Sequence, residues 1–185
     1  MTISPEDRAK LVALARQAVE AQVKGHSRPT VQDAEGIVGE RYGCFVTLTN
    51  SGRLRGCIGT FQPTNTLGEM IVQMGASAAK DSRFVTNPVT PEELPQLTIE
   101  VSVLSKLEKT QHPKQLQLGR DGIYIISGGR SGCFLPEVAT DQNWSVEEFL
   151  SYCCAHKAGL PPDAWRSADT EVYLFTSEKF TDCEK

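Results

Sequence analysis

The sequence lacks several features that would place the protein in a familiar class. It has no apolar run approaching the ~20 residues of a transmembrane helix. Its N-terminal residues show no basic segment followed by an apolar one, as a secretory signal would require. The formal net charge is -4 and the sequence has no cluster of Lys and Arg; both observations disfavour a nucleic-acid surface. We therefore expect a cytoplasmic protein with neither a membrane nor a nucleic acid as partner.

Common metal, redox and hydrolase motifs are also missing. No two cysteines are spaced C-x-x-C, the pattern of zinc ribbons and thioredoxin-like sites. The sequence contains neither G-x-S-x-G nor H-E-x-x-H, which argues against common serine hydrolases and metalloproteases. Because 185 residues without a signal can build a core, we expect reduced thiols rather than a disulfide framework. The six cysteines are Cys44, Cys57, Cys133, Cys153, Cys154 and Cys183.

The most informative stretch that is present is Leu54-Arg55-Gly56-Cys57-Ile58-Gly59. In an extended strand side chains alternate between faces, so Arg55 and Cys57 would point the same way. A guanidinium near sulfur favours the thiolate, which is the nucleophile and the metal ligand. Gly56 and Gly59 leave room for a ligand or another backbone.

Cys57 is therefore our candidate catalytic residue. Arg55 is a candidate for binding an anionic group, and Gly56 and Gly59 are further candidate ligand-binding residues. The alternative is a structural cysteine, buried in a strand beside a surface arginine.

Asp81 and Arg83 form a second candidate pair. They follow a predicted helix that begins with the capping box Thr66-Leu67-Gly68-Glu69 and carries small residues that allow close packing. Asp81 and Arg83 are candidate ligand-binding residues at the edge of a cleft. Equally, they form a local salt bridge or a helix cap.

His156 lies on another predicted helix, which begins at Ser145. It is a candidate general base for Cys57, as in thiol–imidazole pairs, if the fold brings the two together. Cys153 and His156 are three residues apart and could share a helix face. Two ligands do not make a structural zinc site, so we assign no metal ligands; a metal role near Cys153, Cys154 and His156 stays open and would need Cys57, an acid or another cysteine brought in by the fold.

The order of predicted elements indicates an α+β fold with mainly antiparallel pairing. A hairpin followed by a helix and a strand occurs twice, at Cys44 to Leu104 and at Ile123 to Phe175, which hints at an internal duplication. The predicted helices are Pro5 to Lys24, Thr66 to Asp81 and Ser145 to Lys157, and the predicted strands are Cys44 to Thr49, Arg53 to Phe61, Leu97 to Leu104, Ile123 to Ile126, Gly132 to Leu135 and Glu171 to Phe175.

The run Leu54–Gly59, with Phe61 and Pro63 after it, resembles the signature of the AMMECR domain family, also called AmmeMemoRadiSam system protein A. The resemblance extends over nearly the whole chain, from Pro5 to Phe180. Further segments match the family in order: Asp81–Phe84, Glu93–Pro95, Ile99–Leu104, Gly119–Ile123, Phe134–Val138, Trp144, Phe149–Leu150, Lys157–Leu160 and Trp165.

The resemblance implies a single domain over residues 1–185 with two unequal lobes, repeated β-α units and a largely antiparallel, barrel-like sheet. The larger lobe would hold both termini, and a central segment would form the smaller one. The signature would lie by a cleft between the lobes. The resemblance also implies association with a radical-SAM protein and a Memo-like protein.

Two functions fit these expectations. The first is an enzyme or enzyme component in which Cys57 is a nucleophile or a radical or redox relay and Arg55 binds an anion. The second is a non-catalytic module that binds a small molecule or holds a partner protein. Neither the residues nor the resemblance identifies a cofactor.

Overall fold

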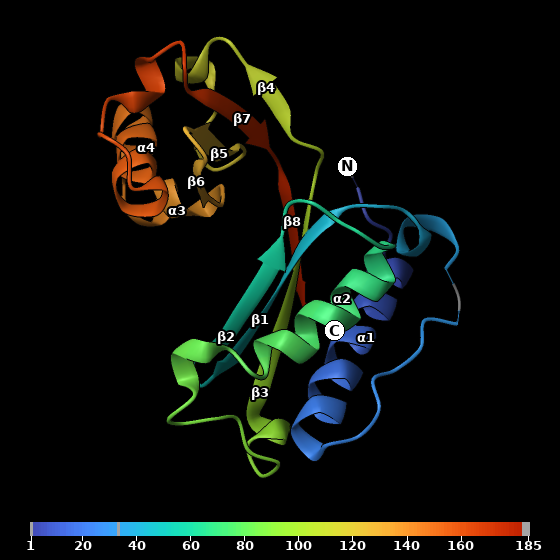
Figure 1. The fold of residues 1–185 in the computed structure, drawn as a ribbon. Coiled ribbons are helices and arrows are strands. Elements are labelled where there is room, and N and C mark those ends of the chain that lie inside the picture. The colour runs from blue at the N-terminus through green and yellow to red at the C-terminus, as the bar shows by residue number, and fades with distance from the viewer. Residues whose placement is uncertain (1, 33, 183–185) are drawn as a thin grey trace. The chain divides into compact units, whose positions relative to one another are not determined.

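The computed structural model describes residues 2–32 and 34–182 and has a mixed α+β fold with two antiparallel sheets (Figure 1). The chain divides into two compact units. Unit 1 comprises Met1–Leu104 and Glu178–Lys185, and unit 2 comprises Ser105–Ser177.

The sheet of unit 1 is built around a central strand, β1, which pairs antiparallel with both of its neighbours. Ser51 and Gly52 join β1 to β2 with positive φ angles of 50° and 75°. This combination is typical of the two-residue turns that match the twist of a hairpin, and it confirms the predicted hairpin. The strands are, in the order β2-β1-β3-β8, Arg53–Thr60, Gly43–Asn50, Leu97–Leu104 and Ser177–Thr181.

Two helices cover one face of this sheet and lie side by side (Figure 1). Helix α1 (Pro5–Lys24) begins at the cap Ser4 and ends at Gly25, whose φ of 72° suits glycine. Helix α2 (Leu67–Ala78) begins with the predicted capping box of Thr66 and Glu69. Their apolar residues and those of the strands form one core, which includes Leu11, Ala15, Val46, Leu48, Ile71 and Ile99. The described part of this unit also contains three short 3-10 helices: η1 (Gly36–Gly39), η2 (Ser82–Phe84) and η3 (Leu94–Gln96).

Unit 2 contains a second four-stranded sheet, in the order β4-β7-β5-β6. The predicted hairpin of β5 and β6 is confirmed, with Gly128 and Gly129 at the turn. The predicted helix at Ser145 is also present, but it changes to a π-helical turn at Cys153. The elements are β4 (Glu108–Thr110), η4 (Pro113–Gln115), β5 (Gly122–Ser127), β6 (Arg130–Phe134), α3 (Glu137–Asp141), α4 (Val146–Tyr152), η5 (Cys153–Ala158), η6 (Ala164–Arg166) and β7 (Glu171–Phe175).

The expectation of a barrel-like sheet is wrong. Within residues 2–32 and 34–182, the strands form two separate open sheets and no closed barrel. Each sheet keeps two edge strands, β2 and β8 in unit 1 and β4 and β6 in unit 2, because no pairing returns from one edge to the other. The expected lobes and the internal duplication stay predictions.

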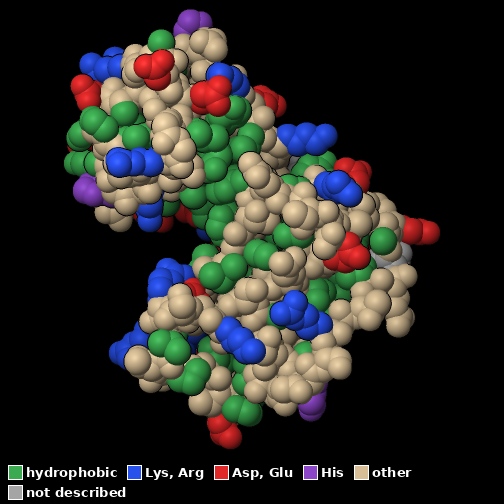
Figure 2. Space-filling view, viewed as in Figure 1, with side chains coloured by type: hydrophobic (Ala, Val, Ile, Leu, Met, Phe, Trp, Pro, Cys, Tyr) green, Lys and Arg blue, Asp and Glu red, His purple; other side chains and the backbone are tan. Residues whose placement is uncertain are grey.

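The described helices include none with the length and apolar character needed to cross a bilayer. The face drawn in Figure 2 carries both Lys or Arg and Asp or Glu side chains.

Candidate functional site

Cys57 lies on β2, on the face of the unit 1 sheet that the helices do not cover. On β1 the fully buried Val46 and Leu48 alternate with the half-buried Thr47, and Cys57 pairs with Thr47. The Thr47 Oγ1 hydroxyl donates a hydrogen bond to the Cys57 Sγ atom at 3.3 Å. The thiol is half-buried. It is therefore not the core cysteine that the alternative interpretation describes.

Arg55 occupies an irregular position of the same strand. Leu48 pairs with Gly56 and Thr49 with Leu54, so Arg55 is the extra residue of a β-bulge. The bulge interrupts the alternation that would place Arg55 and Cys57 on one face. No signal in the sequence marks it, because a bulge depends on the register with the partner strand.

The Arg55 guanidinium is bound to the chain itself. Its Nε donates to Glu93 Oε1 at 2.6 Å and its Nη2 to Glu93 Oε2 at 3.0 Å. The same Nη2 also donates to the carbonyl oxygens of Asn87 and Pro88. The arginine side chain is 11% exposed and the glutamate side chain 15% exposed. The hydrogen bond from Arg55 lowers the pKa of Glu93, so the pair is ionised on both sides.

Asp81 and Arg83 close the free edge of β2 at Cys57. The Cys57 N–H donates to Asp81 Oδ2 at 3.0 Å, and Arg83 Nη2 donates to the Cys57 carbonyl oxygen at 3.1 Å. Asp81 also pairs with the Arg83 side chain and accepts from its backbone N–H, which caps η2. The two side chains thus satisfy the backbone N–H and carbonyl oxygen of Cys57, as the backbone of a neighbouring strand would.

The sequence is compatible with two roles for Asp81 and Arg83: binding a ligand at the edge of a cleft, or forming a local salt bridge or helix cap. The salt bridge and the cap are both confirmed, and their part in ligand binding stays a prediction. The hydrogen bond from Arg83 holds the pKa of Asp81 far below its ordinary value, against the effect of burial. Asp81 is therefore a buried carboxylate whose charge Arg83 compensates.

Gly56 and Gly59 each make room for protein atoms. A Cβ on Gly56 would lie 2.1 Å from the carbonyl oxygen of Ala78 at the end of α2. A Cβ on Gly59 would lie 2.2 Å from the ring of Phe45 on the paired strand. The glycines thus permit a close backbone approach and a ring packed across the strand pair. Their assignment as ligand-binding residues stays a prediction.

A pocket opens beside Arg55, with a volume of ≈ 580 Å³. Phe84 has two cations near its ring, with the Arg55 Cζ 5.7 Å and the Arg83 Cζ 5.8 Å from the ring centroid. Leu54 is 41% exposed at this pocket, and Val85, next to Phe84, is 77% exposed. We call this site the Arg55 pocket; its lining residues include Asn50, Arg53, Leu54, Arg55, Phe84, Asn87 and Glu93.

The remaining predicted thiol and imidazole groups are not assembled into a metal site. Cys153 and Cys154 are fully buried in the core of unit 2, whereas His156 is exposed. The described residues contain no group of three metal-ligating side chains. Cys57 belongs to unit 1 and His156 to unit 2, and their pairing stays a prediction.

The described cysteines divide by burial. Burial raises the pKa of Cys44 to about 12 and also raises the pKa of Cys153 and Cys154. Cys57 and Cys133 are half-buried. Cys183 lies outside the described residues.

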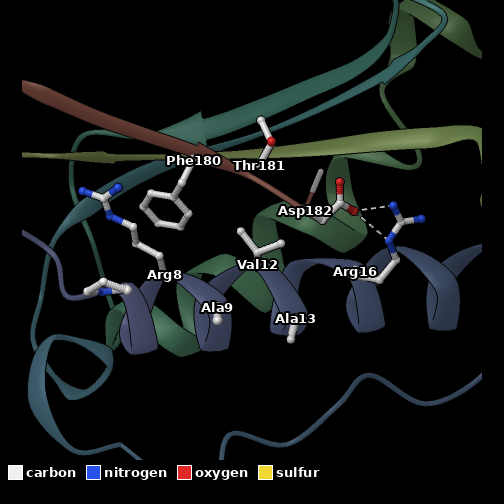
Figure 3. Close-up of a pocket in the computed structure, with 9 residues that line it drawn as sticks. Arg8, Ala9, Val12, Ala13, Arg16, Phe180, Thr181 and Asp182 are labelled. Atoms are coloured by element: carbon white, nitrogen blue, oxygen red, sulfur yellow. Dashed lines mark hydrogen bonds and ion pairs between the residues drawn. The ribbon is translucent and has the colours of Figure 1, made fainter. Parts of the chain in front are cut away.

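A further pocket of unit 1 lies between α1 and β8 and has a volume of ≈ 440 Å³ (Figure 3). Arg16 binds Asp182 there and donates to the carbonyl oxygens of Leu94 and Leu97. Arg8 pairs with Glu178 at 2.5 Å. These bonds fasten the C-terminal strand to α1, so the pocket's arginines have a structural role.

The two open sheets and their helices define an α+β protein of two compact units. The AMMECR1 family model matches residues 12–180, and the chain belongs to this family. Protein TK0174 of Thermococcus kodakarensis is 44% identical over 183 residues, covering 92% of this chain and 87% of the relative. A relative from Methanothermobacter thermautotrophicus is 38% identical and covers 96% of this chain and 95% of its own.

A solved structure has the same fold. The crystal structure of the uncharacterised protein PH0010 from Pyrococcus horikoshii aligns with a TM-score of 0.84 and 39% identity. The alignment covers 94% of this chain and 90% of that one.

Proposed function

We propose that the protein is a binding component of an enzyme system and that it holds a ligand or a partner protein at the Arg55 pocket. The observation that carries this proposal is the pairing of Arg55 with Glu93. A guanidinium that already binds a carboxylate and two carbonyl oxygens is a structural cation. It is not poised to activate a thiol.

The surface at this pocket has the composition of a binding site. Leu54 and Val85 expose apolar side chains, and Phe84 adds a ring within cation–π distance of two arginines. Asn50, Asn87 and Arg53 supply polar groups. Apolar contacts with a few placed polar groups are typical of ligand and partner recognition. Asp81 and Glu93 accept hydrogen bonds from the Cys57 backbone N–H and from the Arg55 side chain; such bonds order the strand before binding and reduce the entropy lost when a ligand or partner binds.

The partners we propose are a radical-SAM protein and a Memo-like protein, on the ground of the family resemblance. The test uses these two proteins, purified from the same organism as this chain. Leu54→Glu and Val85→Glu each place a charge on an exposed position without disturbing the core, and we expect either to weaken binding more than tenfold. Cys57→Ser should bind as the unaltered protein does. Wild-type binding by both glutamate variants, or loss of binding with Cys57→Ser, would overturn the proposal.

The second candidate is an enzyme in which Cys57 is the nucleophile or a radical or redox relay. The half-buried thiol and its hydrogen bond from Thr47 favour it. Once a turnover assay with the partners exists, this candidate predicts that Cys57→Ser retains binding and abolishes turnover. Unchanged turnover would exclude it and leave the binding proposal intact.

A further inference from the structure

Unit 2 contains a pocket whose lining is cationic. It has a volume of ≈ 550 Å³, within the range of small-molecule sites. Among the residues that the structure describes, three cations line it, Lys109, Lys114 and Arg166, and no carboxylate does. The imidazole of His112 also lines it, and Trp165 and Val172 provide a buried apolar floor. We call this site the Trp165 pocket.

The cations are held in place by the indole ring as well as by acids. The Arg166 Cζ lies 4.6 Å and the Lys114 Nζ 5.7 Å from the Trp165 ring centroid, both within cation–π range. The Trp165 Nε1 donates to Ser151 Oγ at 3.1 Å, which fixes the ring. Both cations therefore have a second contact, with the indole ring, besides their carboxylate partner.

That partner is a single exposed carboxylate. Glu147 pairs with both Lys114 and Arg166, so this group of three side chains carries one net positive charge. The Glu147 side chain is 51% exposed and its two partners are 57% and 56% exposed. Lys109 pairs with Glu171 in a similar exposed contact. Exposed pairs contribute little, so an incoming anion can replace Glu147 at small cost.

We propose that the Trp165 pocket binds a small, multiply charged anion, whose charge is carried by phosphate or by carboxylate groups. Such a ligand receives hydrogen bonds from Lys114 and Arg166 in place of Glu147, and Lys109 attracts its second charged group. Arginine and lysine are the side chains that bind both kinds of anion. The site is independent of the binding function proposed for unit 1.

The test is calorimetric titration of the full chain with pyrophosphate and with citrate, at an ionic strength held constant with sodium chloride. Lys114→Gln and Arg166→Gln should each weaken binding about three- to fivefold, as expected for one charge near the surface. Glu147→Gln should tighten binding by a similar factor, because it removes the competing carboxylate. A gain of affinity cannot arise from unfolding. The anion that binds more tightly shows whether phosphate or carboxylate is the recognised group.

The Glu20–Lys24 pair on α1 supplies matched controls, since it is an exposed pair of the same kind in unit 1. Glu20→Gln and Lys24→Gln should leave the affinity unchanged. Quenching or enhancement of Trp165 fluorescence, measured in a Trp144→Phe background, should follow the same saturation curve. The proposal is overturned if neither anion binds at millimolar concentration. It is also overturned if Glu147→Gln and Glu20→Gln behave alike, or if binding persists unweakened in both cation variants.

Discussion

The Arg55 guanidinium and the Glu93 carboxylate meet in a two-point contact, with Nε 2.6 Å from Oε1 and Nη2 3.0 Å from Oε2. The contact joins a bulged strand to the segment that leads into η3. Since Arg55 also binds the carbonyl oxygens of residues 87 and 88, one side chain connects β2 to two other lining residues of the Arg55 pocket, Asn87 and Glu93.

Arg55→Gln should lower the free energy of unfolding by about 2 kcal/mol, because Glu93 would be left largely buried without its cation. Urea unfolding followed by circular dichroism measures this change. The double variant Arg55→Met with Glu93→Leu removes both charges and should recover part of the loss. If Arg55→Gln alone leaves the free energy of unfolding unchanged, the Arg55–Glu93 pair does not stabilise the fold.

The stability of the protein should fall in acid in a way that depends on Asp81. Its folded pKa lies far below the unfolded value of about 3.9, so its contribution is complete above that value and is lost as the pH falls toward the folded pKa. Asp81→Asn should lower the free energy of unfolding at neutral pH. Below about pH 4, the free energy of unfolding of this variant should fall less steeply with decreasing pH than that of the unaltered protein. Unfolding at a series of pH values measures this effect. The exposed Glu6→Gln serves as the control variant, and an equally flat profile for Glu6→Gln would contradict the assignment.

Gly56→Ala should be strongly destabilising, by about 3 kcal/mol, because its Cβ would meet the Ala78 carbonyl oxygen at 2.1 Å. Gly75→Ala is the comparison, since a Cβ there meets its nearest atom at 3.1 Å and alanine favours the helix. Thermal unfolding compares the two variants. Similar melting temperatures would show that β2 and α2 are not packed as tightly as we describe.

The thiols should react in two classes. Cys57 and Cys133 are half-buried and should be alkylated by iodoacetamide in the native protein. Cys44, Cys153 and Cys154 are buried and should be modified only upon unfolding. Mass spectrometry of a Cys183→Ser variant, after timed alkylation, assigns each site. Modification of Cys44 before Cys57 would contradict the placement of Cys57 on the uncovered face.

The parts of the fold that the sequence predicts are those set by local chemistry. The helix that starts at Pro5, the capping box of Thr66, the helix that starts at Ser145, and the hairpin that begins at Cys44 all depend on residues a few positions apart. Each is found where the sequence places it. Strand β8 was not predicted, since its residues Ser177–Thr181 have only one fully buried side chain and no clear alternation of apolar residues.

The parts of the site that sequence reasoning missed depend on distant pairing. The bulge at Arg55 exists only in relation to β1, and Glu93 lies 38 residues after its arginine. The positive charge of Arg55 does not by itself identify which of the acidic residues in the sequence it contacts. Thr47 was missed as the hydrogen-bond donor to Cys57 because the hairpin register, and not the sequence spacing, brings them together. Asp81 and Arg83 were identified, but their bonds to the Cys57 backbone required the structure.

The most direct test of the proposed function is hydrogen–deuterium exchange of the full chain, alone and with saturating radical-SAM or Memo-like protein. We predict that the partner slows exchange in residues 50–58 and 82–88, which include the lining residues of the Arg55 pocket other than Glu93 and the exposed Leu54 and Val85. Protection confined to other segments, with these two unchanged, would contradict the account.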